Sequence, residues 1–194
     1  TPKENFMRNL FAASAAALTV MAAPVLADNH GPNVFNGNIT EDEVFNAQKG
    51  WCGALVEISA ANMKGGQAAA KKVAENVLDS AYAYDNGGVL FKPTLTVAPQ
   101  TFRSTREGAL AYFVGGDPKF PNDSGFALGD WTKCEVLTDG VLLMGNNAIS
   151  MGQVTVTNKQ GQATTVDKTW GWMKDSQGNL RIVLHHSSLE HTGS

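Results

Sequence analysis

Four side chains that can carry chemistry follow one another near the end of the chain: His185, His186, Ser187 and Ser188. They lie in residues 181–189, RIVLHHSSL, a pattern that predicts the final β-strand. Neighbouring side chains of a strand point to opposite faces, so we expect Val183, His185 and Ser187 to share one face. The other face would hold Ile182, Leu184, His186 and Ser188. One histidine–serine pair would then line a pocket, unless this is a hydrogen-bonded edge strand without chemistry.

The four histidines of the chain give little support to a metal centre. A catalytic zinc ion takes three protein ligands and a water molecule. His185 and His186 are expected on opposite strand faces, so they cannot readily share one ion. His30 lies in a polar leader and His191 lies in the tail. We therefore predict no metal cofactor, and the alternative is a weakly bound zinc or manganese ion on one histidine and carboxylates.

Other familiar catalytic motifs are missing from the sequence. It contains no Gly-x-Ser-x-Gly elbow, no phosphate-binding loop and no dinucleotide fingerprint. His185 and Ser187 point the same way from one strand, and residues in that relation rarely form a base–nucleophile hydrogen bond. A hydrolase is therefore a weak interpretation.

Hydroxyl groups and nearby cations favour a pocket for a small, oxygen-rich and anionic ligand. Thr94 and Thr96 share a face of one predicted strand, and Tyr112 lies near the end of a predicted helix. Lys92 and Arg103 are the neighbouring cations, and we assign Arg103 to substrate binding. The structural alternatives are a β-forming threonine on an edge strand and a tyrosine in the core of an amphipathic helix.

Composition and the N-terminus limit the class of protein. The chain has 194 residues, 43% of them hydrophobic, and a net charge of −3, which suits one globular domain without a nucleic-acid partner. Residues 1–27 have the basic start, the apolar run and the small residues of a signal peptide, with cleavage after Ala27. Export predicts a periplasmic protein with no membrane anchor in its mature form. Residues 1–6 precede Met7, and both a native extension and a cloning remnant fit them.

Export also places the two cysteines in an oxidising compartment. Cys52 and Cys134 can form a disulfide there, or remain two buried thiols. We expect residues 28–39 to be a flexible lead-in and residues 40–189 to be a single domain. Residues 190–194 resemble a vector-derived tail.

Helical signals dominate the first half of the domain. Thr40 and Glu43 have the spacing of a capping box, which places the start of a helix at Thr40. Apolar residues at helical spacing continue this helix to about residue 63. Gly65 and Gly66 should break it, and a second helix is predicted over residues 67–84.

The middle of the domain predicts one strand and one short helix. Residues 89–97 form a strand, and Pro93 places it at a sheet edge because proline cannot donate to the ladder. Thr101 or Ser104 would cap a short helix that ends at residue 113.

An antiparallel meander of about four strands is predicted after residue 131. Residues 131–137 form its first strand, and a turn is expected at Asp139 and Gly140. Residues 141–156 form a long strand with a bend near residues 145–147. Hairpin turns follow at residues 159–161 and 176–179. The predicted class is α+β: a curved antiparallel sheet wrapped by N-terminal helices, with a conical pocket that the last strand crosses.

Five stretches of the sequence resemble the iota-class carbonic anhydrases. They are KPTLT at residues 92–96, GALAYF at 108–113, GFALG at 125–129, DKTW at 167–170 and HHSSL at 185–189. The resemblance covers nearly all of the chain that follows the signal peptide. It implies a cone-shaped fold similar to nuclear transport factor 2, usually dimeric, and the reversible hydration of CO2 to bicarbonate by a lyase, carbonate dehydratase.

The resemblance also implies roles for individual residues. Thr94, Tyr112 and Ser187 match the hydroxyl groups that hold bicarbonate in that family, and His185 lies beside them. Members are described both as metal-free and as metal-using, and the few histidines here favour the metal-free form. Our hypothesis is that a water molecule held by Thr94 and Ser187 attacks CO2 while Tyr112 or His185 takes its proton.

Two other functions fit the same fold. One is a periplasmic module that binds a small ligand, or assembles copies of the chain, without catalysis. The other is an isomerase or dehydratase of a larger hydrophobic ligand, which would need a carboxylate base; Asp167 and Glu135 are the candidates. The volume of the pocket separates this isomerase or dehydratase interpretation from a carbonic anhydrase, because a CO2 site is small.

Overall fold

A computed structural model describes residues 37–191 and residue 193. The predicted signal peptide, His30 and most of the lead-in lie outside these residues. Within the described part, no helix has both the length and the apolar character needed to cross a membrane. The end of the predicted flexible lead-in is held in place, because Ile39 is buried and its backbone N–H donates to the Gly145 carbonyl at 2.7 Å.

The long helix α1 (Glu41–Ala81) confirms the predicted start and break. The backbone N–H of Glu43 donates to the Thr40 hydroxyl at 3.3 Å, and the Thr40 N–H donates to the Glu43 carboxylate at 2.8 Å. Gly66 has a φ of 71° and kinks the helix into two segments. The second segment ends at Ala81 rather than at residue 84, because Tyr82 is already extended and bridges to Ile182 of the last strand.

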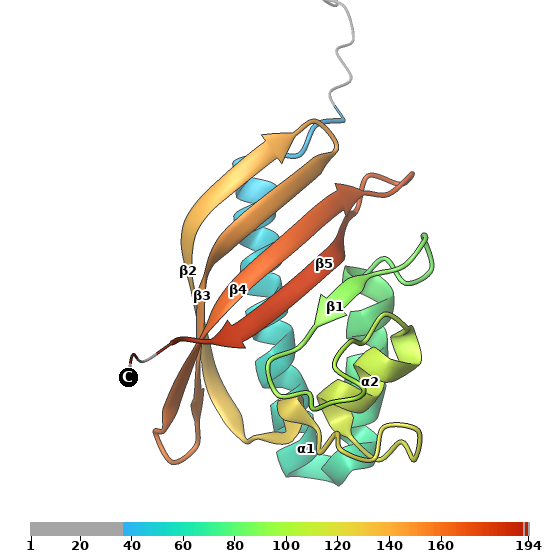
Figure 1. The fold of residues 1–194 in the computed structure, drawn as a ribbon, viewed down its shortest axis with the longest axis vertical. Coiled ribbons are helices and arrows are strands. Elements are labelled where there is room, and N and C mark those ends of the chain that lie inside the picture. Colours follow the sequence, from blue (N-terminus) through green and yellow to red (C-terminus); the bar gives the residue numbers. More distant parts are fainter. Residues whose placement is uncertain (1–36, 192, 194) are drawn as a thin grey trace, which may run out of the picture. The chain divides into compact units, whose positions relative to one another are not determined.

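Five strands form one curved sheet (Figure 1). They are β1 (Leu90–Lys92), β2 (Trp131–Met144), β3 (Asn147–Asn158), β4 (Ala163–Lys174) and β5 (Leu180–Leu189), in the spatial order β1-β5-β4-β3-β2. β2 to β5 form the predicted antiparallel meander, and β1 adds to β5 in parallel at the edge. The hairpin turns predicted near residues 160 and 177 are confirmed.

Two boundaries predicted around the third helix are wrong. β1 has only three residues and ends before Pro93, which cannot donate to a ladder. The helix α2 (Arg106–Val114) is capped by Thr105, whose hydroxyl accepts from the Gly108 N–H at 3.1 Å, and not by Thr101 or Ser104. Residues 93–105 therefore form a loop rather than a strand followed by a helix.

The turn expected at Asp139 and Gly140 is also wrong. β2 continues through these residues with a bulge between Thr138 and Gly140, and the hairpin turn comes at residues 145–146. Gly152 of the partner strand permits this bulge, because a Cβ at Gly152 would lie 2.0 Å from the Leu137 carbonyl oxygen. Gly145, with a φ of 69°, supplies the conformation that the turn needs.

Helices cover one face of the sheet, and the core lies between them (Figure 1). Trp51 and Leu55 of α1 are buried there together with Trp170 and Trp172 of β4. Cys52 and Cys134 form a disulfide that joins α1 to β2, with their Cα atoms 5.2 Å apart. The predicted α+β class, a curved antiparallel sheet wrapped by helices, is confirmed.

Candidate active site

A small cavity lies where the inner face of the sheet meets α1, α2 and the loop after β1. The centre of a water-sized sphere can move through about 20 Å³ of it, which is space for about one small molecule. Polar side chains reach it from β4, from β5, from α2 and from the loop after β1: Thr94, Tyr112, Thr164, Lys168, His185 and Ser187. Its apolar walls include Trp51, Phe91, Phe126 and Val154.

Three hydroxyl groups named from the sequence meet at this cavity. The Thr94 hydroxyl donates to the Ser187 hydroxyl at 2.7 Å. β1 makes this possible, because it pairs with β5 in the register Phe91 opposite His185, so the turn after Pro93 carries Thr94 towards Ser187. The Tyr112 side chain lies against the backbone of Thr94 and Leu95, and burial raises its pKa well above 10, so it is a neutral hydroxyl.

His185 is buried in a chain of hydrogen-bonded side chains. Its Nδ1 lies 2.9 Å from the Tyr82 hydroxyl oxygen, which also accepts from the Trp51 indole N–H at 2.9 Å. Its Nε2 lies 2.8 Å from the Lys168 amine. The Phe91 ring stacks on the imidazole with the centroids 4.3 Å apart. Burial, and then the neighbouring Lys168, hold the pKa of His185 well below 6.5, so the ring is neutral at physiological pH.

The face assignment for the last strand needs one correction. His185 and Ser187 are buried on the inner face and His186 is exposed on the other, as predicted. A register shift between Gly171 and Trp172 leaves Val183 without a partner, however. The extra residue reverses the alternation, and therefore Ile182, not Val183, shares the inner face with His185.

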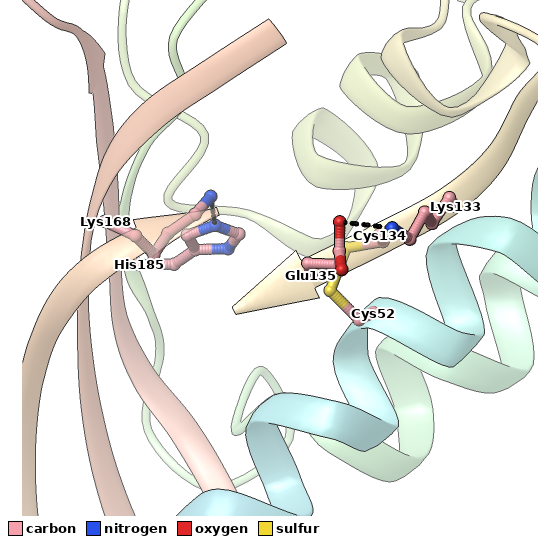
Figure 2. Close-up of a disulfide and its surroundings, with 6 residues drawn as sticks. All are labelled: Cys52, Lys133, Cys134, Glu135, Lys168 and His185. Atoms are coloured by element: carbon pink, nitrogen blue, oxygen red, sulfur yellow. Dashed lines mark hydrogen bonds and ion pairs between the residues drawn. A yellow bond between two sulfur atoms is a disulfide. The ribbon is translucent and has the colours of Figure 1, made fainter. Parts of the chain in front are cut away.

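Lys168 is a cavity residue that we did not assign from the sequence. Its side chain lies over the rings of Trp51 and Trp170, with the nitrogen 4.7 and 5.5 Å from their centroids. It lies beside His185, and the two side chains lie apart from the disulfide between Cys52 and Cys134 (Figure 2). Burial lowers the pKa of Lys168 to about 7. The alternation of side chains along β4 could have identified Lys168 as an inward-facing residue, because it lies on the same inner face as Val166 and Trp170.

Comparison with known families decides the identity of this site. A sequence model described as "Metal-independent carbonic anhydrase" matches residues 42–189. The chain belongs to this family. It is 56% identical over 156 residues to the metal-independent carbonic anhydrase of Nostoc sp. (strain PCC 7120), a match that covers 80% of this chain and 76% of that protein.

One solved structure agrees with this assignment, and a second shares the fold. The crystal structure of an iota-carbonic anhydrase from a cyanobacterium, complexed with bicarbonate, is 54% identical, with a TM-score of 0.82 over 84% of this chain and all of that one. A putative calcium/calmodulin-dependent kinase II association domain from Xanthomonas campestris is 23% identical, with a TM-score of 0.53 over 83% of this chain and 95% of that one. This second likeness concerns the fold only.

The protein is thus a carbonic anhydrase, a lyase that interconverts CO2 and bicarbonate. The family description confirms the prediction of a reaction without a metal cofactor. Separately, residues 37–191 and 193 contain no group of three or more histidine, cysteine, aspartate or glutamate side chains placed to hold a metal ion.

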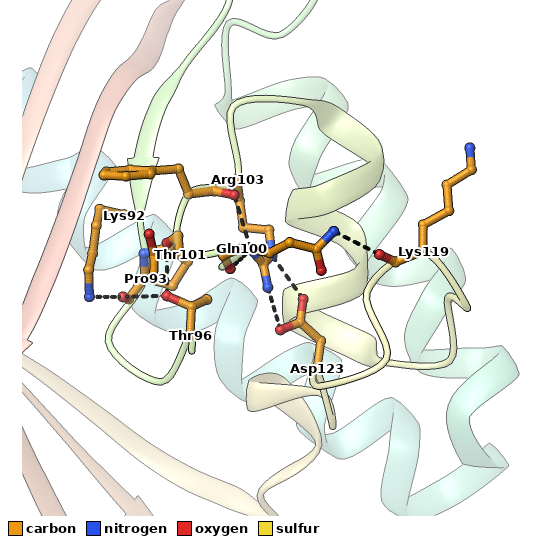
Figure 3. Close-up of polar contacts among 9 residues, drawn as sticks. Lys92, Pro93, Thr96, Gln100, Thr101, Arg103, Lys119 and Asp123 are labelled. Atoms are coloured by element: carbon orange, nitrogen blue, oxygen red, sulfur yellow. Dashed lines mark hydrogen bonds and ion pairs between the residues drawn. The ribbon is translucent and has the colours of Figure 1, made fainter. Parts of the chain in front are cut away.

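Arg103, which we assigned to substrate binding, is not among the described residues that line the carbonic anhydrase cavity. Its guanidinium donates to both carboxylate oxygens of Asp123, at 2.9 and 2.6 Å, and to the carbonyls of Gln100 and Phe102 (Figure 3). The other predicted cation, Lys92, donates to the Pro93 carbonyl at 2.8 Å. The structure therefore gives Arg103 a role in holding loop 93–105 together.

Proposed function

We propose that this carbonic anhydrase hydrates CO2 inside the cavity, with the hydroxyls of Thr94, Ser187 and Tyr112 holding the reacting molecules. The observation that carries the proposal is the hydrogen bond between Thr94 and Ser187, at the wall of a space that holds about one small molecule. One of these hydroxyls can orient the attacking water. The others can donate to the oxygens of CO2 as they acquire negative charge.

A site of this kind must avoid free hydroxide. Zinc lowers the pKa of bound water from about 15.7 to about 7, a difference worth roughly 12 kcal/mol. Neutral hydroxyls supply no comparable charge, so the O–H bond of water has to break as the new C–O bond forms. The two proton acceptors of our hypothesis fit this step poorly. The pKa of Tyr112 lies well above 10, and that of His185 lies well below 6.5 with both ring nitrogens already in contacts.

The cavity does not favour a larger hydrophobic substrate. Ligand pockets for drug-sized molecules usually measure about 300 to 1,000 Å³, far above the space available here. Neither proposed carboxylate base lines the cavity. Asp167 borders a hollow on the outer face of the sheet, and Glu135 forms an exposed ion pair with Lys133 at 2.8 Å (Figure 2).

Ser187→Ala tests the site. We expect it to lower the rate of CO2 hydration by about 10²- to 10³-fold, because it removes a donor aimed at the developing charge. Stopped-flow hydration measurements on folded protein check this expectation. Ser188→Ala is the matched control, since Ser188 lies on the opposite face of the same strand, and it should retain the wild-type rate. Equal rates for both variants would remove Ser187 from the mechanism.

We also propose that the protein is exported to the periplasm and forms a homodimer. The signal-peptide pattern of residues 1–27 and the disulfide between Cys52 and Cys134 support export, because disulfides persist in oxidising compartments.

An apolar row across the outer face of the sheet supports the dimer. Exposed members of this outer row are Leu90, Leu142 and Ile149.

A further inference from the structure

Lys168 is the one amine among the described residues that line the cavity. It is only 5% exposed, and β4 and β5 place it directly opposite Ser187 in register. Side chains of directly opposite residues lie within contact range on the same sheet face. The amine is therefore built into the wall that carries the Thr94–Ser187 hydrogen bond, and the hydroxyl mechanism does not use it.

We propose that Lys168 receives the proton that leaves water during hydration, and that the resulting ammonium pairs with bicarbonate in the closed cavity. This inference deepens the proposed function and rests on the same site. The water oxygen bonds to the carbon of CO2, and one C=O electron pair moves onto oxygen. One water O–H bond breaks, and its proton goes to the Lys168 lone pair, directly or through the Ser187 hydroxyl. After bicarbonate leaves, the ammonium returns the proton to solvent.

Few of the groups around Lys168 could accept the proton from water in its place. Of the titratable side chains, His185 of β5 contacts the amine, Tyr112 of α2 shares its cavity, and Tyr82 after α1 contacts the far side of the imidazole. Burial raises the pKa of both tyrosines, and the pKa of His185 lies far below neutrality. β3 contributes only apolar side chains to the cavity, among them Val154. The pKa of Lys168, at about 7, matches what a base needs at neutral pH.

His185 and Tyr82 can orient the amine as positioning residues. Lys168 keeps its lone pair free when one of its N–H groups donates to Nε2 of His185, which is 2.8 Å away. The imidazole hydrogen is then on Nδ1 and donates to the Tyr82 oxygen, which accepts the Trp51 N–H as well. The same arrangement accommodates the ammonium, because the ammonium also donates to Nε2.

A positive charge that forms together with the product explains how a buried cavity without a resting charge can bind and release an anion. Before reaction the cavity holds an uncharged amine and uncharged CO2. After reaction it holds a cation and an anion together, so neither charge is buried unpaired. Arg103 cannot serve in this way, since Asp123 already neutralises it. Bicarbonate should therefore bind together with a proton.

Lys168→Met tests the inference with a side chain of similar length and no basic group. We expect hydration to fall by at least about 100-fold, and the rise of the wild-type rate with pH through about 7 to disappear. Lys133→Met, in an exposed ion pair, is the control and should keep both the rate and the pH profile. A folded Lys168→Met protein with the wild-type rate and profile would overturn the inference.

A measurement on the wild-type protein gives an answer even if Lys168→Met does not fold. Calorimetric titration with pre-equilibrated bicarbonate at about pH 8, in two buffers of different ionisation enthalpy, counts the protons taken up. We expect uptake of about one proton per bicarbonate, because the amine is mostly free before binding. Binding without proton uptake would refute the role of Lys168. Loss of activity in Ser187→Ala with full activity in Lys168→Met would retain the site and reject only this inference.

Discussion

At the scale of single residues, the neighbouring groups determine the roles of two buried basic side chains. The side chains of Arg103 and Asp123 are both 2% exposed and are joined by two hydrogen bonds, so this guanidinium stabilises the fold. Lys168 contacts two indole rings and one imidazole, and no carboxylate pairs with it among the described residues. Burial without a counter-charge lowers the pKa of the amine and makes it chemically useful.

Arg103→Met separates a structural role from substrate binding. We expect the free energy of unfolding to fall by about 3 to 5 kcal/mol, because Asp123 would be left as an uncompensated buried charge. Urea denaturation measures this loss. Adding Asp123→Leu to the first change should recover part of it. If Arg103→Met unfolds like the wild type but has lost bicarbonate affinity, our original assignment to substrate binding would be correct.

At the scale of elements, small irregularities place the site. The bulge at Val183 turns Ile182 into the core and leaves His185 and Ser187 facing the cavity. The three-residue strand β1 ends just early enough for the loop to bring Thr94 to Ser187. The disulfide fixes α1 to β2 one residue away from Trp51, which forms part of the cavity wall.

Removing the disulfide should loosen the joint between α1 and β2. We expect the Cys52→Ser, Cys134→Ser double variant to lose about 2 to 4 kcal/mol of unfolding free energy, because 82 residues separate the two cysteines in sequence. Denaturation with and without a reductant measures it. Reductant should destabilise the wild type and leave the variant unchanged. A wild type insensitive to reductant would show that the bond contributes nothing to stability.

At the scale of the whole molecule, the two faces of the sheet have different tasks. The inner face meets the helices and encloses the cavity. The outer face exposes apolar side chains, with Leu90 72%, Leu142 59% and Ile149 40% accessible. Contiguous apolar surface of this kind is typical of an interface, and we expect a second copy of the chain to cover it.

Ile149→Lys should turn the dimer into a monomer, because it places a charge in the middle of the outer apolar row. Light scattering after size-exclusion chromatography gives the mass. Met63→Lys, on an exposed position of α1, is the control and should remain dimeric. A monomeric wild type would contradict the proposed dimer.

The proposed export predicts a processed N-terminus. Sequencing the N-terminus of protein taken from the periplasm of the native cell should find Asp28 first. An intact leader would contradict the proposed cleavage.

Much of the fold could be predicted because its signals are local. The capping box at Thr40, the kink at Gly66 and the two later hairpin turns depend on residues only a few positions apart. The alternation in the last strand correctly placed His185 and Ser187 on the inner face. The turn at Asp139 and Gly140 was predicted wrongly, because the choice between turn and bulge depends on the partner strand at Gly152.

The sequence by itself determined the family and the α+β class, since short motifs and periodicity carry that information, and it predicted the hydroxyl residues of the site. Only the tertiary structure decided that Arg103 holds a loop, that His185 is enclosed by Tyr82 and Lys168, and that Lys168 reaches the cavity. The physical reason is that charge, burial and pKa depend on neighbours brought together from distant parts of the chain. Asp123 lies 20 positions from Arg103, and Lys168 lies 17 from His185.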